Sequence, residues 1–115
     1  MTIGTGLVAS AAVLLLACGA ERYATENCWV MAHQAEMAAG GTEPSVASIA
    51  QVFKQFEKQR YNLLARHTKL TAADWRAWEK AKGEVWMNPR EMLKAGLIDK
   101  ILPSKSPVRK KRTKK

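Results

Sequence analysis

The chain has 115 residues, of which 47% are hydrophobic, and it carries a formal net charge of +9. This length and composition indicate one small globular domain and exclude a protein of two domains. Seven lysine and arginine residues lie within the last eleven positions, so the rest of the chain is nearly neutral.

An apolar run from Leu7 to Cys18 has two interpretations. It has the length of a signal-peptide core, is too short to span a bilayer, and ends in Leu15–Cys18, which loosely imitates a lipid-attachment box. Two features argue against an exported lipoprotein: no Lys or Arg precedes Arg22, and Leu16 is bulky where such boxes carry a small or branched residue. We therefore favour a cytoplasmic domain without a membrane segment.

The favoured interpretation of the same residues is a buried strand over Thr2–Leu7, a tight turn and a buried helix. Ser10 is a residue type that often begins a helix, the Ala, Val and Leu residues after it favour helix, and Gly19 would end it. A helix that is apolar on every side must be surrounded by protein. We expect this helix to lie at the centre of a larger packed body.

The next residues predict a second strand and a long helix. Asn27 marks a turn, and residues 28–32 form a short apolar run rich in β-formers. The glycines and proline of residues 34–45 indicate a loop. From Ser45 to His67 apolar residues recur at helical spacing, which predicts an amphipathic helix. His67 at its end is better explained as a cation near the negative end of the helix dipole than as a catalytic group.

Two shorter helices follow. Thr71–Asp74 has the form of a capping box, and the helix that it begins would end at Gly83. Its Trp75 and Trp78 are better explained as packing anchors than as a ligand cage. After an extended piece at residues 85–87, Asn88 and Pro89 begin a short helix that Gly96 closes, and residues 97–102 predict a last strand.

Alternating strands and helices indicate an α/β fold for residues 1–102. Only two or three strands are predicted, however, and a parallel strand without neighbours leaves backbone groups unpaired. Residues 103–115 have no apolar residue after Val108 and should form a disordered basic tail. This tail either keeps the protein soluble or contacts nucleic acid or an acidic partner, and the first is favoured because no aromatic residue accompanies the charges.

Neither a metal nor a cofactor is predicted. Cys18 and Cys28 lie in apolar surroundings and lack the spacing of a zinc site or of a disulfide framework, which favours a reducing compartment. The chain has no P-loop, so it should not bind ATP.

Ser10 and His33 are the residues that could take part in catalysis. A hydroxyl at a strand-to-helix turn meets the positive end of the helix dipole, and the amide of Ala11 can point at an oxyanion formed on attack. A serine nucleophile also needs an imidazole in hydrogen-bond reach and a carboxylate that fixes the ring's tautomer. Adjacent parallel strands can bring a helix-opening Ser and a strand-end His together, although each residue alone is more often structural.

Three segments resemble one family. GLVASAAVLLLACGAERYATENCWVMAHQ, residues 6–34, resembles the nucleophile-to-histidine stretch of the Clp protease proteolytic subunit, the ClpP-like serine peptidases that include phage head-maturation proteases. Residues 63–68 are similar to the family's Leu-rich helix ending in His-Thr. Residues 86–99 are similar to its segment in which an aromatic and a helix with Glu lead to Gly-Leu-Ile/Val-Asp. The resemblance covers roughly residues 2 to 102.

The resemblance implies the C-terminal part of a ClpP/crotonase-like fold, with few parallel strands and flanking helices. It implies Ser10 as nucleophile, His33 as general base and the amide of Ala11 as an oxyanion donor. Glu84 stands where the family usually has the third triad residue, an Asp two positions before the aromatic. Asp99 is a poor substitute, because the family's matching Asp ends the helix–strand turn rather than meeting the His.

The resemblance also implies a serine endopeptidase that works through an acyl-enzyme in a homo-oligomeric ring. Partners would be a Clp-type ATPase unfoldase or, for phage-type members, capsid or scaffold proteins. The family's N-terminal half, with a second oxyanion donor, is absent from the resemblance. A separate polypeptide could supply it, the gene could be a truncated remnant, or the start could be assigned too far downstream. The alternative function is an inactive, structural subunit of a ring assembly.

Overall fold

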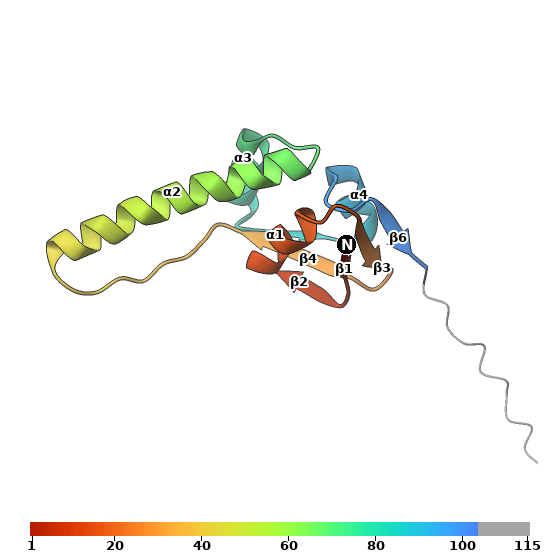
Figure 1. The fold of residues 1–115 in the computed structure, drawn as a ribbon, viewed down its shortest axis with the longest axis horizontal. Coiled ribbons are helices and arrows are strands. Elements are labelled where there is room, and N and C mark those ends of the chain that lie inside the picture. The colour runs from red at the N-terminus through yellow and green to blue at the C-terminus, as the bar shows by residue number, and fades with distance from the viewer. Residues whose placement is uncertain (104–115) are drawn as a thin grey trace, which may run out of the picture.

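The structure, a computed structural model, describes residues 1–103, so the predicted tail lies almost wholly outside the described residues. Within them the chain forms two small sheets with four helices around them, an α/β arrangement consistent with part of a ClpP-like fold (Figure 1). No helix in this part of the chain is both long enough and apolar enough to cross a bilayer.

The first sheet has the order β1-β3-β6 and is parallel throughout. Its strands are β1 (Thr2–Gly4), β3 (Arg22–Thr25) and β6 (Lys100–Leu102). β3 was not predicted, because Ala24 is its only fully buried residue and the strand lacks apolar alternation. The last strand was predicted to begin three residues too early, at Leu97, which instead lies buried in the turn before β6.

The second sheet has the order β2-β4-β5. Its strands are β2 (Leu7–Ala9), β4 (Trp29–His33) and β5 (Glu84–Met87). β2 and β4 run parallel, whereas β4 and β5 run antiparallel. The prediction of one strand over Thr2–Leu7 was wrong, because the chain turns at Gly6, whose φ of 62° favours glycine, and β1 and β2 enter different sheets.

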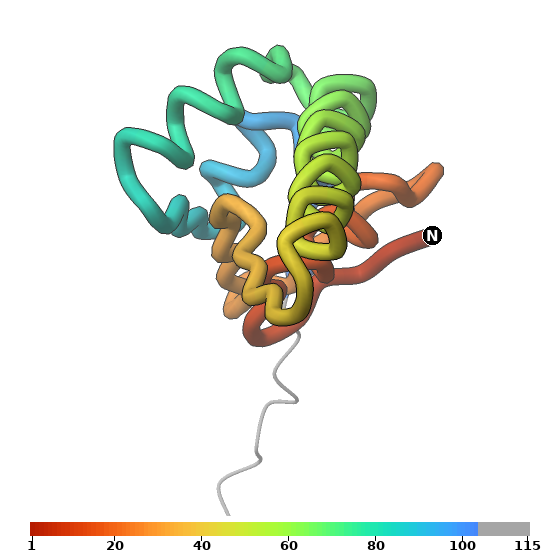
Figure 2. The backbone as a smooth tube through the Cα atoms, turned by 90° about the vertical axis from the view of Figure 1, so that its left-hand side faces the viewer, coloured from red at the N-terminus to blue at the C-terminus, as the bar shows by residue number. Residues whose placement is uncertain are grey.

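Four helices cover the sheets. They are α1 (Ala11–Ala17), α2 (Glu43–His67), α3 (Ala72–Lys82) and α4 (Pro89–Ala95). α2 projects away from the sheets as a rod, and Figure 2 looks almost along it. It begins at Glu43 rather than at Ser45, since the Thr42 side chain accepts a hydrogen bond from the Ser45 amide.

The capping signals in the second half of the chain are confirmed. Thr71 and Asp74 form a reciprocal capping box at the start of α3, and Asn88 and Glu91 form another at the start of α4. Gly96 follows α4 in the left-handed conformation, with φ at 79°. Gly83 ends α3 as predicted, with φ at 72°, so β5 and its first residue Glu84 follow directly.

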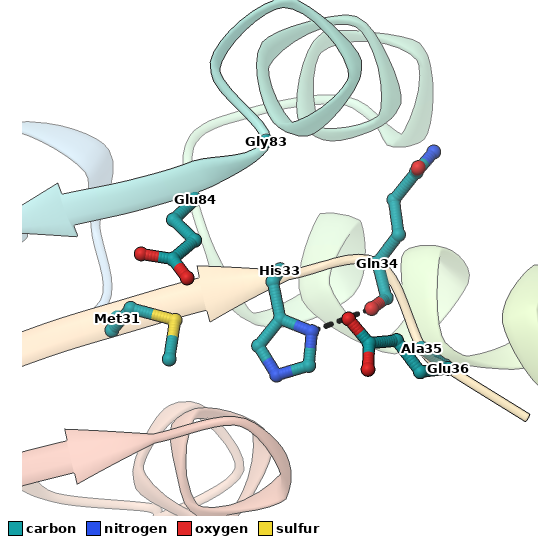
Figure 3. Close-up of a pocket in the computed structure, with 7 residues that line it drawn as sticks. All are labelled: Met31, His33, Gln34, Ala35, Glu36, Gly83 and Glu84. Atoms are coloured by element: carbon teal, nitrogen blue, oxygen red, sulfur yellow. Dashed lines mark hydrogen bonds between the residues drawn. The ribbon is translucent and has the colours of Figure 1, made fainter.

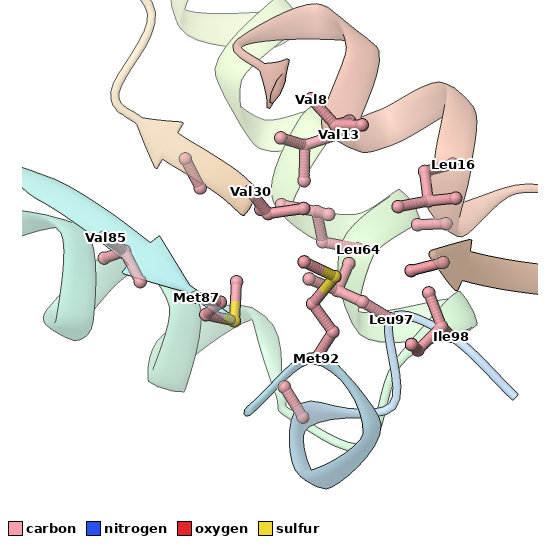
Figure 4. Packing of buried hydrophobic residues seen from close by; sticks show 14 of the residues in the cluster. Val8, Val13, Leu16, Val30, Leu64, Val85, Met87, Met92, Leu97 and Ile98 are labelled. Carbon is pink, nitrogen blue, oxygen red and sulfur yellow. The ribbon is translucent and has the colours of Figure 1, made fainter. Parts of the chain in front are cut away.

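The core is one cluster to which both sheets and all four helices contribute (Figure 4). Trp75 is its largest fully buried side chain, and its indole nitrogen donates to the Thr68 hydroxyl at 3.0 Å. The predicted packing role of Trp75 and Trp78 agrees with this burial and with their ring centroids lying 5.7 Å apart. The centre of the cluster comprises Val8, Val13, Leu16, Val30, Leu64, Met87, Met92 and Leu97.

Arg22 ties the ends of three helices to the first sheet. Its guanidinium donates to the carbonyls of Ala17, His67 and Gly96, and it pairs with the Asp99 carboxylate at 2.8 Å. The side-chain and backbone hydrogen bonds from Arg22 lower the pKa of Asp99. This arginine therefore places its positive charge at the C-terminal ends of three helices, where a cation is favoured.

The helix α1 is less enclosed than its sequence predicts. Val13, Leu16 and Ala17 are buried but Leu15 is 71% exposed, so the described residues cover only one side of this helix, and the expectation of a larger packed body around it stays a prediction. β1 and β2 are edge strands of their sheets. The face that includes these two strands and α1 consequently presents both apolar side chains and unpaired strand edges.

Candidate active site

Ser10 occupies the turn between β2 and α1. Its φ of 55° and ψ of −123° make it the only non-glycine residue with positive φ among residues 1–103. Such a conformation costs on the order of 1–3 kcal/mol and is concentrated at functional sites. Ser10 is the N-cap residue of α1, as its residue type predicts, but its hydroxyl makes no capping hydrogen bond. A side chain placed on a strained strand-to-helix turn is instead turned outward from the backbone.

His33 ends β4, the parallel neighbour of β2. Ala9 pairs with Met31, and the Ser10 amide continues the ladder by donating to the Met31 carbonyl at 3.0 Å. This register brings the next residues on the two strands to the same edge of the sheet. The Ser10 Oγ lies 2.5 Å from the His33 Nε2, which is hydrogen-bonding distance.

The second ring nitrogen decides the tautomer of His33. Its Nδ1 lies 2.5 Å from the main-chain carbonyl oxygen of Gln34 (Figure 3). A carbonyl oxygen only accepts hydrogen bonds, so Nδ1 carries the proton in the neutral ring. Nε2 is then the acceptor and Ser10 the donor. This is the tautomer in which an imidazole can take a proton from a serine.

Glu84 lies directly opposite His33 in the antiparallel pairing of β4 and β5. Residues 84 and 86 are exposed while 85 and 87 are buried, so Glu84 and Trp86 share the outer face of β5. The carboxylate Oε2 accepts a hydrogen bond from the Trp86 indole at 3.2 Å. The structure therefore brings Glu84 next to His33, but the Glu84 carboxylate accepts its hydrogen bond from Trp86, and the His33 ring bonds to Gln34 through Nδ1.

An open pocket of about 490 Å³ adjoins the histidine. It is lined by Met31, His33, Gln34, Ala35, Glu36, Gly83 and Glu84 (Figure 3). Glu36 was not among the predicted site residues, and neither was Gln34. The Gln34 contact uses the main chain, which the residue type does not predict, and Glu36 lies in a segment without helix or strand periodicity, so no sequence pattern pointed to it.

The other predicted residues lie as follows. Ala11 is exposed. Because it is the first residue of α1, its amide is one of the four N–H groups that have no acceptor within the helix. Asp99 pairs with Arg22 and not with His33. Cys18 is exposed and Cys28 buried, and burial raises the pKa of the Cys28 thiol. Within residues 1–103 no group of three His, Cys, Asp or Glu side chains is placed to hold a metal ion.

Comparison with known proteins gives one family. Residues 1–105 match the family model described as Clp protease. The chain is 34% identical over 106 residues to the ATP-dependent Clp protease proteolytic subunit of Bacteroides thetaiotaomicron, a match that covers 90% of this chain and 47% of the relative.

Two further relatives carry the same kind of name. The ATP-dependent Clp protease proteolytic subunit 2 of Rhodococcus jostii is 31% identical over 103 residues, covering 88% of this chain and 52% of the relative. Subunit 1 of Protochlamydia amoebophila is 31% identical over 106 residues, covering 90% and 51%. The chain therefore spans about half the length of the curated relatives that it matches.

Proposed function

The chain belongs to the Clp protease family, and from that premise we propose that it carries the nucleophile and the general base of a serine endopeptidase. The observation that carries the proposal is the 2.5 Å contact between the Ser10 Oγ and the His33 Nε2, with the ring in the tautomer that accepts a proton. The strained turn at Ser10 supports it, since a structural serine has no need of a positive φ.

In the proposed reaction the Ser10 oxygen attacks the carbonyl carbon of a peptide bond while its proton passes to His33 Nε2. The imidazolium then gives this proton to the departing amine, which leaves an acyl-enzyme ester on Ser10. Water deprotonated by His33 attacks the ester, and the serine leaves with the proton returned. The carbonyl of Gln34 accepts from Nδ1 throughout and holds the ring against Ser10.

Glu84 is proposed as the third member of the site, on the strength of its place opposite His33 in the strand pair. A carboxylate beside an imidazolium stabilises the positive charge that forms during attack. The Ala11 amide is the proposed oxyanion donor, since it is a free N–H at the start of the helix that follows the nucleophile. One lost donor of this kind typically costs about 10²–10³ in rate.

The proposed peptidase activity requires the half of the relatives' length that this chain does not cover. Its docking face would be the edges of β1 and β2 together with a hollow of about 230 Å³ next to α1. Ile3, Ala12 and Leu15 line this hollow, and all three are exposed. Strands of the other half, on the same or on a separate polypeptide, would pair with these edges and cover the apolar side chains.

A ring assembly with a Clp-type ATPase is proposed by analogy with the names of the relatives, which are ATP-dependent proteolytic subunits. The rod-like α2 supports an oligomer, because Ile49, Val52 and Phe56 expose apolar surface along it. The substrates would be unfolded polypeptides or, for a phage-type member, capsid or scaffold proteins.

The second candidate is a non-catalytic subunit that keeps the fold and assembles with active partners. One observation favours it: the Glu84 carboxylate bonds to the Trp86 indole and not to the His33 ring. A subunit without a working triad could retain this arrangement, because nothing then requires a carboxylate at Nδ1.

Hydrolysis of a fluorogenic peptide tests the choice. The chain is produced together with the coding sequence upstream of residue 1, and assembled material is assayed as wild type, Ser10→Ala and His33→Ala. Ser48→Ala, which removes an exposed serine of α2, is the matched control. The peptidase proposal expects activity in the wild type and in Ser48→Ala and none above background in the two site variants. Assembled wild type without hydrolysis, or activity that survives Ser10→Ala, contradicts it.

A further inference from the structure

The outer face of β5 carries a hydrogen bond that competes with the proposed site. Along this strand the Trp86 Nε1 donates to the Glu84 Oε2 at 3.2 Å. Across the strand pair Glu84 stands opposite His33, and Trp86 stands opposite Met31. All four residues therefore lie on one face of the sheet, where directly opposed side chains have Cβ atoms about 4.5–5.5 Å apart.

Two hydrogen-bond donors on the β4–β5 pair thus lie beside Glu84. One is the indole N–H of Trp86, which holds it in this structure, and the other is the Nδ1–H of His33, which the Gln34 carbonyl holds. An indole has no acceptor of its own, so the carboxylate is the group that satisfies it. Trp86 lies two residues along β5, whereas His33 lies across the strand pair, so the bond to the indole draws the Glu84 side chain along its own strand and away from the histidine.

We propose that Trp86 is a positioning residue: its indole holds the Glu84 carboxylate along β5 in the arrangement of this structure, in which the Gln34 carbonyl orients the ring, and Glu84 takes the third position of the site only when it leaves the indole. The inference rests on the proposed function, because it concerns the third member of that site. Removal of the indole N–H frees the carboxylate to swing toward Nδ1. A carboxylate that reaches the ring favours the imidazolium and raises the pKa of His33.

The charged side chains that line the pocket with His33 are Glu36, on the segment after β4, and Glu84, on β5, and the facing residue before α1 is the uncharged Ser10. Glu36 is therefore the carboxylate that must be separated from Glu84 in the test. His67, at the end of α2, is the second histidine of the chain and serves as an internal reference.

The test is the pKa of the His33 ring in the full chain, measured by NMR titration. Trp86→Phe keeps the aromatic ring and removes the donor, and it should raise the pKa of His33 by about 0.5 unit while that of His67 stays constant. Trp29→Phe is the matched control, since Trp29 is 49% exposed and Trp86 48% exposed on the same sheet. It should leave the pKa of His33 unchanged.

Double variants assign the shift to its carboxylate. The increase should vanish in Trp86→Phe with Glu84→Gln and persist in Trp86→Phe with Glu36→Gln. Where the concentration for NMR causes association, the pH dependence of diethyl pyrocarbonate modification, mapped to His33 and His67 by mass spectrometry, gives the same quantity, because the reagent attacks neutral imidazole.

The proposal is overturned if Trp86→Phe leaves the pKa of His33 as it is in Trp29→Phe, or if the increase survives Glu84→Gln. If Phe at position 86 disturbs the fold, Glu84→Gln alone tests the proposal. A carboxylate held by the indole predicts that this variant lowers the pKa of His33 by less than about 0.3 unit, and a larger decrease overturns the proposal. None of these measurements needs catalysis. An inactive protein would contradict the proposed function, but the pKa of His33 could still be measured in it.

Discussion

The ion pair that joins α2 to α3 gives the largest predicted effect on stability. Both terminal nitrogens of Arg60 donate hydrogen bonds to the Glu79 carboxylate, one of them at 3.2 Å. The Arg60 Nε donates to the Glu57 carboxylate at 2.9 Å. Glu79 is fully buried. Burial alone would lower the pKa of Arg60, but the two glutamates outweigh it and raise the pKa above its usual range, so the guanidinium is charged.

Arg60→Ala would leave the Glu79 carboxylate buried without its cation. Breaking a buried pair in this way costs about 3–5 kcal/mol. A domain of this kind has a total stability of about 5–15 kcal/mol, so the variant would lose about a fifth of it or more. Because α3 leads through Gly83 directly into β5, the strand that carries Glu84 would be loosened as well.

Pulse proteolysis across a urea series measures the loss, at chain concentrations low enough to avoid association. Arg66→Ala is the matched control, since Arg66 is an exposed arginine of the same helix and its removal should change the stability by no more than about 0.5 kcal/mol. Replacing both partners, Arg60→Met with Glu79→Leu, should recover most of the loss. If Arg60→Ala costs no more than Arg66→Ala, the pair does not hold α3 in place.

Three other perturbations have defined outcomes. Gly19→Ala should destabilise the fold by about 1–3 kcal/mol in urea unfolding, because its Cβ would lie 2.3 Å from the Thr2 Oγ1; an unchanged midpoint would contradict this packing. Leu15→Lys should reduce aggregation, measured by light scattering, and should change the stability by no more than about 0.5 kcal/mol. Scattering equal to that of the wild type would show that the exposed Leu15 does not cause aggregation. Arg22 lowers the pKa of Asp99, so this carboxylate stabilises the fold above its unfolded pKa of about 3.9 and the contribution is lost as the pH falls through the lower folded value. The stability of Asp99→Asn should therefore fall less steeply between pH 5 and pH 2, and parallel curves would refute the assignment.

The elements that the sequence predicts best are those with local signals. The capping boxes at Thr71 and Asn88 place α3 and α4 within a residue or two, because a cap is a contact between residues three positions apart. The strands fared worse. β1 and β3 have three and four residues, and their pairing joins segments some twenty residues apart, which no short window of sequence reports.

The candidate site divides along the same line. The resemblance singles out Ser10, His33 and Glu84, and the structure brings the first two into hydrogen-bonding distance. The bonds that the sequence could not predict are those set by conformation: the Gln34 carbonyl on Nδ1 depends on the backbone where β4 ends, and the Trp86 indole on Glu84 depends on a rotamer. The first of these bonds sets the tautomer of the His33 ring, and the second sets the direction of the Glu84 side chain.

The central claim is that Ser10 and His33 act as one nucleophile–base pair, and the pH profile of a fluorophosphonate's reaction with the assembled protein tests it most directly. We predict phosphonylation mapped to Ser10, with a rate that rises with pH as the His33 ring loses its proton and that collapses in His33→Ala. Reaction at another serine, or a Ser10 rate indifferent to the loss of His33, would contradict the claim.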